Sequence, residues 1–312
     1  MNVPTRADVL AAARRIDGEV IRTPLTRHSI GGVEVAVKWE NRQTGGAFKL
    51  RGASNRLLDL TDAQKQVGIV AFSSGNHARG VAIAARRLGI RATIVMPEDA
   101  PAVKLEATRA EGAEIVTYDR MTESREEIAA HLAGTTGATL VPSFDDPWII
   151  AGQGTVGLDL LDQSAEAVQR ILVCCGGGGL SAGIALACPD AEIVVVEPEG
   201  WDDMARSLSV GSPQSVGSNP PPTLCDAIQT FRPAEATVSI LREAGARGLQ
   251  VSEMAVREAV RWAWRECGET VEPGGSVALA AFLSGVVSPR DGDVAIVSGG
   301  NVDPALHAEL VA

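Results

Sequence analysis

A single lysine in a glycine-rich segment is the residue of this sequence best suited to nucleophilic chemistry. Lys49 follows Gly45, Gly46 and Phe48 and stands where a helix is expected to begin. An amine attacks a carbonyl only after it loses its proton, and a partly desolvated pocket beside other cations lowers the pKa of a lysine toward neutrality. Most lysines at helix starts are solvated surface charges, so Lys49 alone is weak evidence for a nucleophile. The motifs that accompany it strengthen this interpretation.

Three polar or glycine-rich motifs downstream could complete a site around Lys49. They span residues 73–77, 176–181 and 298–301, and each follows a short apolar run that is typical of a buried strand. Ligands of open α/β sheets bind beyond the carboxyl ends of the strands, which is where these motifs fall. In their order and spacing the four segments resemble the serine/threonine dehydratase and serine racemase family. These are pyridoxal-phosphate enzymes of the tryptophan-synthase-β fold type, and the resemblance runs from the N-terminal helix to Asn301.

The second of these motifs is suited to binding an anion. It comprises Gly176, Gly177, Gly178 and Gly179, followed by Leu180 at an expected helix start. Glycines let backbone N–H groups approach an anion, and the helix N-terminus adds a favourable dipole. The run also satisfies a loose GxGxxA pattern with Glu197 at the end of the next strand, so a dinucleotide site and a tight structural turn are alternatives. Lys49 favours a phosphate cup for pyridoxal phosphate, because a dinucleotide site has no use for that lysine.

The resemblance implies a cofactor role for residues of three motifs. Lys49 would hold pyridoxal phosphate as a Schiff base, with Phe48 packed near the ring. The glycine run and Leu180 would hold the phosphate, and Ser298 would face the pyridine nitrogen. A hydroxyl partner leaves that nitrogen largely unprotonated, which suits β-elimination. Taken alone, a serine that caps the helix after the strand is the alternative.

The segment 73–77 precedes an expected helix at residues 78–88, so its free N–H groups could hold a substrate carboxylate. The residues concerned are Ser73, Ser74, Gly75, Asn76 and His77. By resemblance Asn76 would contact the 3-oxygen of the cofactor. Ser74 would face the substrate Cα from the side opposite Lys49, from which a racemase returns a proton. An ordinary N-cap cluster is the alternative, and the family more often carries glutamine at the position of Arg79.

An acidic segment after another strand resembles the cation site of the same family. Glu197, the carbonyl of Trp201 and Asp203 would bind Mg²⁺ or Ca²⁺ together with waters. Hard oxygen ligands suit such ions. The family usually carries a smaller residue at the position of Trp201, and acidic residues at a helix start are common without any metal.

The composition excludes several classes of function. The net charge of −11 argues against a nucleic-acid partner, whose phosphates require a basic face. The odd count of five cysteines, without CxxC spacing, fits reduced thiols in the core. No apolar run approaches the roughly 20 residues that a membrane span needs, and the chain opens without a signal sequence, so no membrane partner and a cytoplasmic location are expected.

The hydrophobic pattern alternates between strands and helices, which predicts an open α/β architecture. Apolar runs predict strands at residues 67–72, 92–96, 114–116, 170–174, 193–196 and 294–297. Helical spacing is found at residues 78–88, 102–110, 123–132, 154–161 and 252–266, and the proline-rich residues 209–223 are expected to form a surface loop. The resemblance implies two open twisted sheets in two domains. Residues 1–52 and 146–312 would form a large cofactor-binding domain, and residues 53–145 a small substrate-side domain.

The resemblance implies a lyase that removes water and ammonia from a β-hydroxy amino acid, with L-threonine or L-serine as the expected substrate. Serine racemase and 3-hydroxyaspartate ammonia-lyase are the alternatives, and a nucleotide-binding module is the non-enzymatic one. Arg125 lies near the substrate by resemblance and could favour a second carboxylate. The family often has asparagine near Phe144, and its absence makes racemization less attractive. No segment follows Ala312, where biosynthetic threonine dehydratases carry a regulatory module, so a catabolic enzyme is expected, and the family suggests a homodimer.

Overall fold

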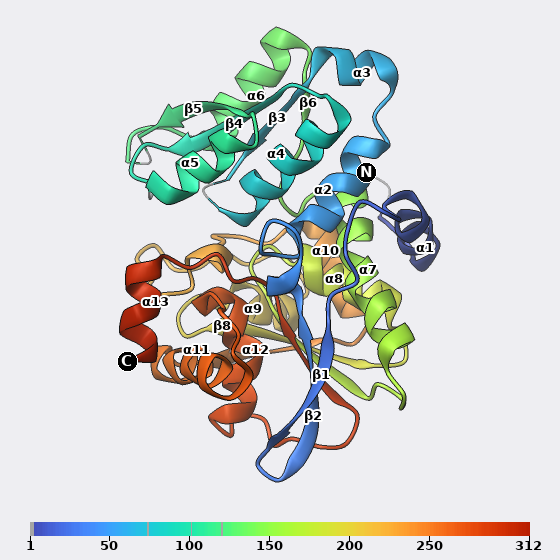
Figure 1. Cartoon of the computed structure of the whole chain (residues 1–312), viewed down its shortest axis with the longest axis vertical. Helices are drawn as coiled ribbons and strands as arrows, with labels where there is room; N and C mark the ends of the chain where they lie inside the picture. Colours follow the sequence, from blue (N-terminus) through green and yellow to red (C-terminus); the bar gives the residue numbers. More distant parts are fainter. Residues whose placement is uncertain (1–2, 74, 101, 120) are drawn as a thin grey trace.

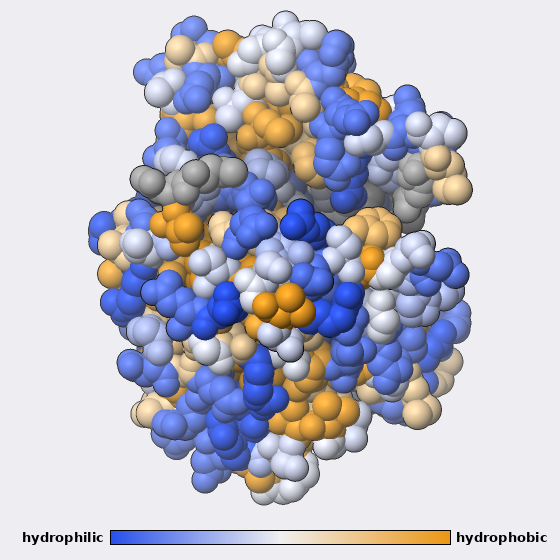
Figure 2. Space-filling view, turned by 180° about the vertical axis from the view of Figure 1, so that it is seen from behind, coloured by the Kyte–Doolittle hydropathy of each residue, from blue (hydrophilic) through white to orange (hydrophobic). Residues whose placement is uncertain are grey.

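A computed structural model describes residues 3–73, 75–100, 102–119 and 121–312 of the 312-residue chain. It contains a six-stranded sheet and a four-stranded sheet, which form the cores of two stacked units (Figure 1). The predicted α/β fold with two open sheets is thereby confirmed. On the face opposite to that of Figure 1, hydrophobic residues occur in small groups among hydrophilic ones, as on most globular proteins (Figure 2).

The six-stranded sheet forms the large unit, in the order β1-β2-β10-β7-β8-β9. The strands are β1 (Leu25–Ile30), β2 (Val33–Trp39), β7 (Arg170–Cys174), β8 (Glu192–Pro198), β9 (Arg247–Val251) and β10 (Asp293–Val297). Only β1 and β2 pair antiparallel, and the other neighbours are parallel. The central strands β7, β8 and β10 are buried along almost their whole length, which explains their continuous runs of valine, isoleucine and leucine.

Helices cover the large sheet. They are α1 (Arg6–Arg15), α2 (Lys49–Leu58), α7 (Pro147–Gln163), α8 (Gly179–Ala187), α9 (Asp203–Val210), α10 (Glu235–Glu243), α11 (Glu253–Cys267), α12 (Pro273–Leu283) and α13 (Pro304–Val311), with short 3-10 turns η1 (Glu40–Arg42) and η2 (Asp226–Ile228). Helix α12 packs on β7, β8, β9 and β10 and is itself covered by α11. Helix α8 packs on β7 and β8 and is covered by α7.

The four-stranded sheet is entirely parallel, in the order β5-β4-β3-β6. It comprises β3 (Ile69–Phe72), β4 (Ala92–Pro97), β5 (Glu114–Tyr118) and β6 (Thr139–Leu140), with helices α3 (Asp62–Val67), α4 (Asn76–Leu88), α5 (Ala102–Ala110) and α6 (Arg125–Thr136). Side chains alternate between its two faces: Ile69 and Ala71 pack with α4, whereas Val70 packs with Ala129 of α6. The sheet is therefore covered on both faces.

Helix α2, which begins at Lys49, connects the two units because it packs against both α4 and α7. Gly52 and Gly152 lie at its crossing with α7, and a Cβ atom on Gly152 would come within 2.6 Å of the Gly52 Cα. The crossing therefore requires glycine at both positions. Arg51 on α2 is buried and forms a bidentate ion pair with buried Glu40, with both contacts at 2.8 Å. These contacts fix the start of α2, and with it Lys49, relative to the large sheet.

All six predicted strands are present, but β1, β2, β6 and β9 were not predicted. The β1–β2 hairpin turns at Gly31 and Gly32, both with positive φ, which is the two-residue turn that a glycine pair favours. Helix α7 begins at Pro147, seven residues before the predicted 154–161, because the Asp146 carboxylate caps it at the amide of Ile149.

The described residues contain no helix that is both long and apolar enough to cross a membrane. We retain the division at residues 52 and 145 as a proposal, since the small sheet draws its strands only from the inserted segment.

Candidate active site

The carboxyl ends of β3, β7 and β10 bring the predicted motifs to one cleft between the two units. Two cavities in this cleft share Lys49, Asn76 and Glu272 among their lining residues. The cofactor-side cavity, of about 540 Å³, is also lined by Phe48, Cys174, Gly176, Gly177, Gly178, Gly179, Leu180 and Ser298. The substrate-side cavity, of about 670 Å³, is also lined by Ser73, Gly75, His77, Lys104, Arg125 and Asp226.

Lys49 is the first residue of α2, and its side chain is enclosed where the two cavities meet. Its Nζ donates to the carbonyl of Ser143 at 2.9 Å and lies 5.1 Å from the centroid of the Phe48 ring. Burial lowers the pKa of Lys49 to about 8, and the neighbouring Cys174 and Glu272 limit the decrease. This amine can therefore exchange a proton near neutral pH, as a nucleophile must.

The loop before Lys49 is tied to the end of β10. The amide of Phe48 donates to the carbonyl of Ser298 at 3.1 Å, and Ala47 forms an isolated antiparallel bridge with Gly299. Ser298 is buried beside Cys174, whose pKa burial raises to about 11. Lys49 and Ser298 therefore line one cavity although they are 249 positions apart in the sequence.

The glycine run connects β7 to α8 and forms one wall of the cofactor-side cavity. A Cβ atom on Gly177 would come within 2.3 Å of the Phe144 ring, and Gly178 has a φ of +88°. The first N–H groups of a helix have no partner within it, so this turn offers donors to an anion. The residues present thus fit a phosphate group at one end of the cavity and an amine-reactive carbonyl at the Lys49 end.

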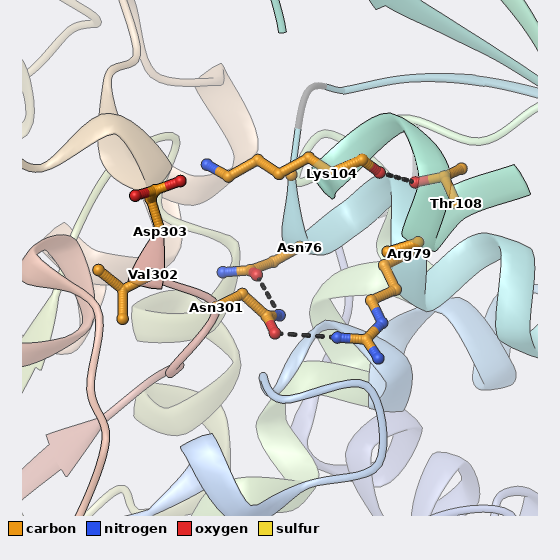
Figure 3. A pocket seen from close by; sticks show the side chains of 9 residues that line it. Asn76, Arg79, Lys104, Thr108, Asn301, Val302 and Asp303 are labelled. Atoms are coloured by element: carbon orange, nitrogen blue, oxygen red, sulfur yellow. Dashed lines mark hydrogen bonds between the residues drawn. The ribbon is translucent and has the colours of Figure 1, made fainter. Parts of the chain in front are cut away.

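A chain of polar side chains connects the cleft to a third cavity, of about 540 Å³ (Figure 3). The Asn76 Nδ2 donates to the Glu272 Oε1 at 2.5 Å, and the Asn301 Nδ2 donates to the Asn76 Oδ1 at 2.7 Å. Arg79 donates in turn to the Asn301 Oδ1 at 3.0 Å. Asn76 is therefore held in one orientation by partners from α12 and the loop after β10. Arg79, whose role the sequence left open, is the outer member of this chain.

Glu272 is an acidic group of the site that the sequence did not reveal. It is buried at the start of α12 and lines both active-site cavities. Burial raises the pKa of Glu272 to about 7, and the nearby charge of Asp226 adds to the effect. Lys49, Lys104 and the hydrogen bond from Asn76 oppose it. Glu272 looks in the sequence like an ordinary residue before a helical proline, and its partner Asn76 is 196 positions away.

His77 is buried within α4 and lines the substrate-side cavity. Burial and the charge of nearby Lys49 lower the pKa of His77 to about 3, so the ring is neutral at physiological pH. Its Nε2 lies 3.0 Å from the carbonyl of Val141 and must carry the ring proton there, because a carbonyl can only accept. The Nδ1 is buried without a partner among the described residues, so it can accept a hydrogen bond but cannot donate one.

The substrate-side cavity has two cations in addition to Lys49. Lys104 of α5 forms an ion pair with Asp226 of η2 at 2.5 Å. Arg125, the first residue of α6, pairs with Glu126 at 2.8 Å and stacks over the Phe72 ring at 5.6 Å. The predicted position of Arg125 on the substrate side thus agrees with the cavity lining, whereas Lys104 was not predicted.

The predicted cation ligands lie together at the start of α9, away from these cavities. The Glu197 carboxylate accepts from the amides of Met204 and Ala205, both at 2.9 Å. Burial raises the pKa of Glu197 well above its usual range, with Asp203 adding to the effect, and burial raises that of Asp203 to about 7. The Asp203 Oδ2 is buried and has no hydrogen-bond partner among the described residues. Two buried carboxyl groups with an orphaned oxygen fit a hard cation. No group of three or more His, Cys, Asp or Glu side chains suited to a metal occurs in the described part of the chain.

The structure thus brings into one cleft every predicted cofactor and substrate residue that it describes. Ser74 lies outside the described residues. Phe48, Asn76, the glycine run, Leu180 and Ser298 line the cofactor-side cavity, and Ser73, Gly75 and His77 line the substrate-side one. The roles of these residues toward a cofactor or substrate stay predictions.

Comparisons with known proteins agree with this arrangement. A family model described as pyridoxal-phosphate dependent enzyme matches residues 16–299. The L-threo-3-hydroxyaspartate ammonia-lyase of Pseudomonas sp is 43% identical, over 100% of this chain and 99% of that protein. Among solved structures, maize serine racemase has a TM-score of 0.91 at 35% identity and covers 99% of this chain and 97% of its own. The threonine deaminase of T.th. has a TM-score of 0.88 at 42% identity, with 96% of this chain and 99% of its own covered.

Proposed function

The chain belongs to the family of pyridoxal-phosphate dependent enzymes, as an ammonia-lyase-type member, and on that premise we propose that it deaminates L-threo-3-hydroxyaspartate to oxaloacetate and ammonia. This substrate replaces the L-threonine or L-serine that the sequence led us to expect. The observation that carries the proposal is the pair of additional cations, Lys104 and Arg125, in the substrate-side cavity. L-threonine has a methyl group where 3-hydroxyaspartate has its second carboxylate. A carboxylate can pair with Lys104 or Arg125 in place of their partners Asp226 and Glu126, whereas a methyl group cannot. The likeness to the Pseudomonas ammonia-lyase supports the same choice.

Pyridoxal phosphate, when bound, supplies an aldehyde that condenses with amines and a ring that withdraws electrons from the substrate Cα. Lys49 would hold this group through its Nζ. Because burial lowers the pKa of Lys49 to about 8, the released amine can take the Cα proton near neutral pH. The Phe48 ring lies beside this amine, with its centroid 5.1 Å from the Nζ.

The remaining cofactor contacts would divide between the two ends of the cavity. The amides of the glycine run and Leu180 would bind the phosphate through the N-terminus of α8. Ser298 would place a hydroxyl at the ring nitrogen, and Asn76, fixed by Glu272 and Asn301, would place its amide at the 3-oxygen. These donors would fix the orientation of the bound group relative to the Lys49 amine.

The substrate's own carboxylate would bind at the N-terminus of α4, where Ser73 and Gly75 line the cavity. The Ser73 Oγ accepts from the Gly75 amide at 3.2 Å, which shapes this turn. His77 would stay neutral and offer its free Nδ1 to the substrate β-hydroxyl, which it can orient but not protonate. The phosphate of the cofactor, once held by the amides of the glycine run, would be the acidic group that it supplies to the site.

Serine racemization is a second candidate, supported by the structural likeness to maize serine racemase. It would require Ser74 to return a proton on the face opposite Lys49. The Phe144 ring lies against Gly177, and the absence of the asparagine that the family often has near Phe144 argues for elimination. Formation of D-serine from L-serine, followed by chiral chromatography, tests this activity separately from ammonia release.

We also propose that Glu197, the Trp201 carbonyl and Asp203 bind Mg²⁺ or Ca²⁺ and that the enzyme is a homodimer. The orphaned Asp203 oxygen and the raised pKa of both carboxyl groups support the cation site. A cation there would stabilise the start of α9, which packs on β8 and β9. Sedimentation measures the oligomeric state, and the melting temperature with and without chelator tests the cation site.

The experiment for the main proposal compares three substrates with the holoenzyme. Ammonia release is measured for L-threo-3-hydroxyaspartate, L-threonine and L-serine at equal enzyme concentration, with oxaloacetate detected by a coupled reduction. The proposal expects kcat/KM to be at least about tenfold higher for hydroxyaspartate than for threonine, which is the contribution of one hydrogen bond to a charged group. A preference for threonine or serine would refute it.

A further inference from the structure

An ion pair bridges the two units at the substrate-side cavity. Lys104 projects from α5 of the small unit toward the large unit (Figure 3), and its Nζ lies 2.5 Å from the Asp226 Oδ2 of η2. Both residues line the substrate-side cavity, together with Lys49. The Lys104 side chain is 21% exposed, whereas that of Asp226 is 54% exposed. The ammonium group is thus held within the cavity wall, and its carboxylate partner is the more solvated of the two.

This contact shows that the cavity wall accommodates a carboxylate at the Lys104 ammonium. Arg125, the other additional cation, interacts with Glu126 and with the face of the Phe72 ring. Those two partners belong to the same unit as Arg125 and need not move when a ligand enters. Asp226, in contrast, lies across the cleft from Lys104 and can be replaced by a carboxylate that enters between the two units.

We propose that Lys104 binds the second carboxylate of the substrate and that Asp226 occupies this position in the free enzyme. The inference rests on the proposed function, because only a dicarboxylate can exchange with Asp226. A monocarboxylate such as threonine has no group for Lys104, so it leaves the Lys104–Asp226 pair intact. The pair therefore discriminates between substrates, and Lys104 is the specificity-determining residue.

Because the substrate carboxylate would replace Asp226 at Lys104, substitutions of these two residues should have opposite effects on the affinity for the dicarboxylate. Removal of the Lys104 charge deprives the substrate of its partner. Removal of the Asp226 charge frees Lys104, so that the state competent to bind a dicarboxylate is populated without prior opening of the pair. If the ion pair were purely structural, both substitutions would impair activity to a similar extent.

The test measures kcat/KM for L-threo-3-hydroxyaspartate and for L-threonine with Lys104→Gln, Asp226→Asn and the double variant. We expect Lys104→Gln to lower the hydroxyaspartate-to-threonine ratio about tenfold or more, the typical contribution of a charged hydrogen bond. Asp226→Asn should lower the KM for hydroxyaspartate about threefold, because the substrate no longer has to break the Lys104–Asp226 pair. The factor is small because an exposed ion pair contributes little free energy. In the Lys104→Gln background, Asp226→Asn should have no effect on that KM.

Matched controls on the same helix separate local from general charge effects. Arg109→Gln and Glu106→Gln each change the net charge as the two test variants do, at exposed positions of α5 outside the cavities, and should leave the ratio unchanged. If Asp226→Asn still lowers the KM for hydroxyaspartate in the double variant, the substitution acts only through the overall charge of the cavity. The proposal that the substrate carboxylate replaces Asp226 at Lys104 is then refuted. If Arg125→Gln collapses the ratio and Lys104→Gln does not, Arg125 is the receptor.

The failure of this inference can be told apart from the failure of the proposed function. A wild-type enzyme that prefers threonine refutes both, whatever the variants do. A wild-type enzyme that prefers hydroxyaspartate, with an unchanged ratio in Lys104→Gln, refutes only the role of Lys104. Circular dichroism of each variant establishes that it is folded, and its activity on threonine serves as an internal reference.

Discussion

Replacement of Glu272 by glutamine should stabilise the cofactor-free protein at alkaline pH and have a much smaller effect at acidic pH. Glu272 is buried, and its pKa is raised from 4.5 to about 7, first by burial and then by the charge of Asp226. The folded state therefore holds the proton of Glu272 more tightly than the unfolded state does. The associated stability is fully present below pH 4.5 and is lost as the pH rises through 7.

The size of the effect follows from the two pKa values. At 1.36 kcal/mol for each tenfold change in proton affinity, a rise from 4.5 to about 7 corresponds to about 3 kcal/mol of stability lost at pH 8. At pH 5 the same relation gives a loss of about 1 kcal/mol. Glutamine keeps the oxygen that accepts from Asn76 and carries no charge, so the variant should gain about 2 to 3 kcal/mol on the wild type between pH 5 and pH 8.

Urea denaturation of the cofactor-free wild type and of Glu272→Gln, at pH 5 and pH 8, measures this difference. The other titrating groups are common to both proteins and cancel in the comparison. Glu266→Gln, at an exposed position, is the matched control and should show no such pH dependence. An equal difference at both pH values, or a variant less stable than the wild type at pH 8, would show that Glu272 does not carry a raised pKa.

Three further predictions concern the cofactor cup, the support of Lys49 and the cation site. Gly177→Ala should weaken binding of pyridoxal phosphate about tenfold or more in an absorbance titration, because the added Cβ lies 2.3 Å from the Phe144 ring. An unchanged affinity would contradict the proposal that the glycine run binds the cofactor phosphate. Arg51→Met should lower the free energy of unfolding by about 3 to 5 kcal/mol, since it leaves a buried carboxylate unpaired, whereas Arg257→Met at an exposed pair should change it by about 0.5 kcal/mol or less. Asp203→Asn should abolish any rise of the melting temperature with Mg²⁺, and a wild-type melting curve that is insensitive to chelator would dismiss the cation site.

The sequence was sufficient for those parts of the fold and site that have local signals. The buried parallel strands were predicted because each is a continuous apolar run. The motifs after β7 and β10 lie together because these neighbouring strands end at one edge of the large sheet, whereas the motif after β3 comes from the small sheet and joins them only where the two units meet. The β1–β2 hairpin was missed although Gly31 and Gly32 mark its turn, because β1 carries polar residues along much of its length.

The parts of the site that depend on long-range contacts were not predictable in this way. Glu272 meets Asn76 across 196 residues, and Lys104 meets Asp226 across 122. Neither Glu272 nor Lys104 belongs to a motif, and each meets its partner only where the small and large units come together. The perturbed pKa of Glu272 likewise arises from burial between the units, which no local pattern encodes.

The central claim is that pyridoxal phosphate is bound covalently by Lys49. The chain has only four lysines, Lys38, Lys49, Lys65 and Lys104, so borohydride reduction of the holoenzyme followed by peptide mass spectrometry can assign the linkage without ambiguity. We expect the reduced cofactor on the peptide that contains Lys49, and its loss together with the yellow colour in Lys49→Ala. A stable adduct on another lysine, or none on any, would contradict the account.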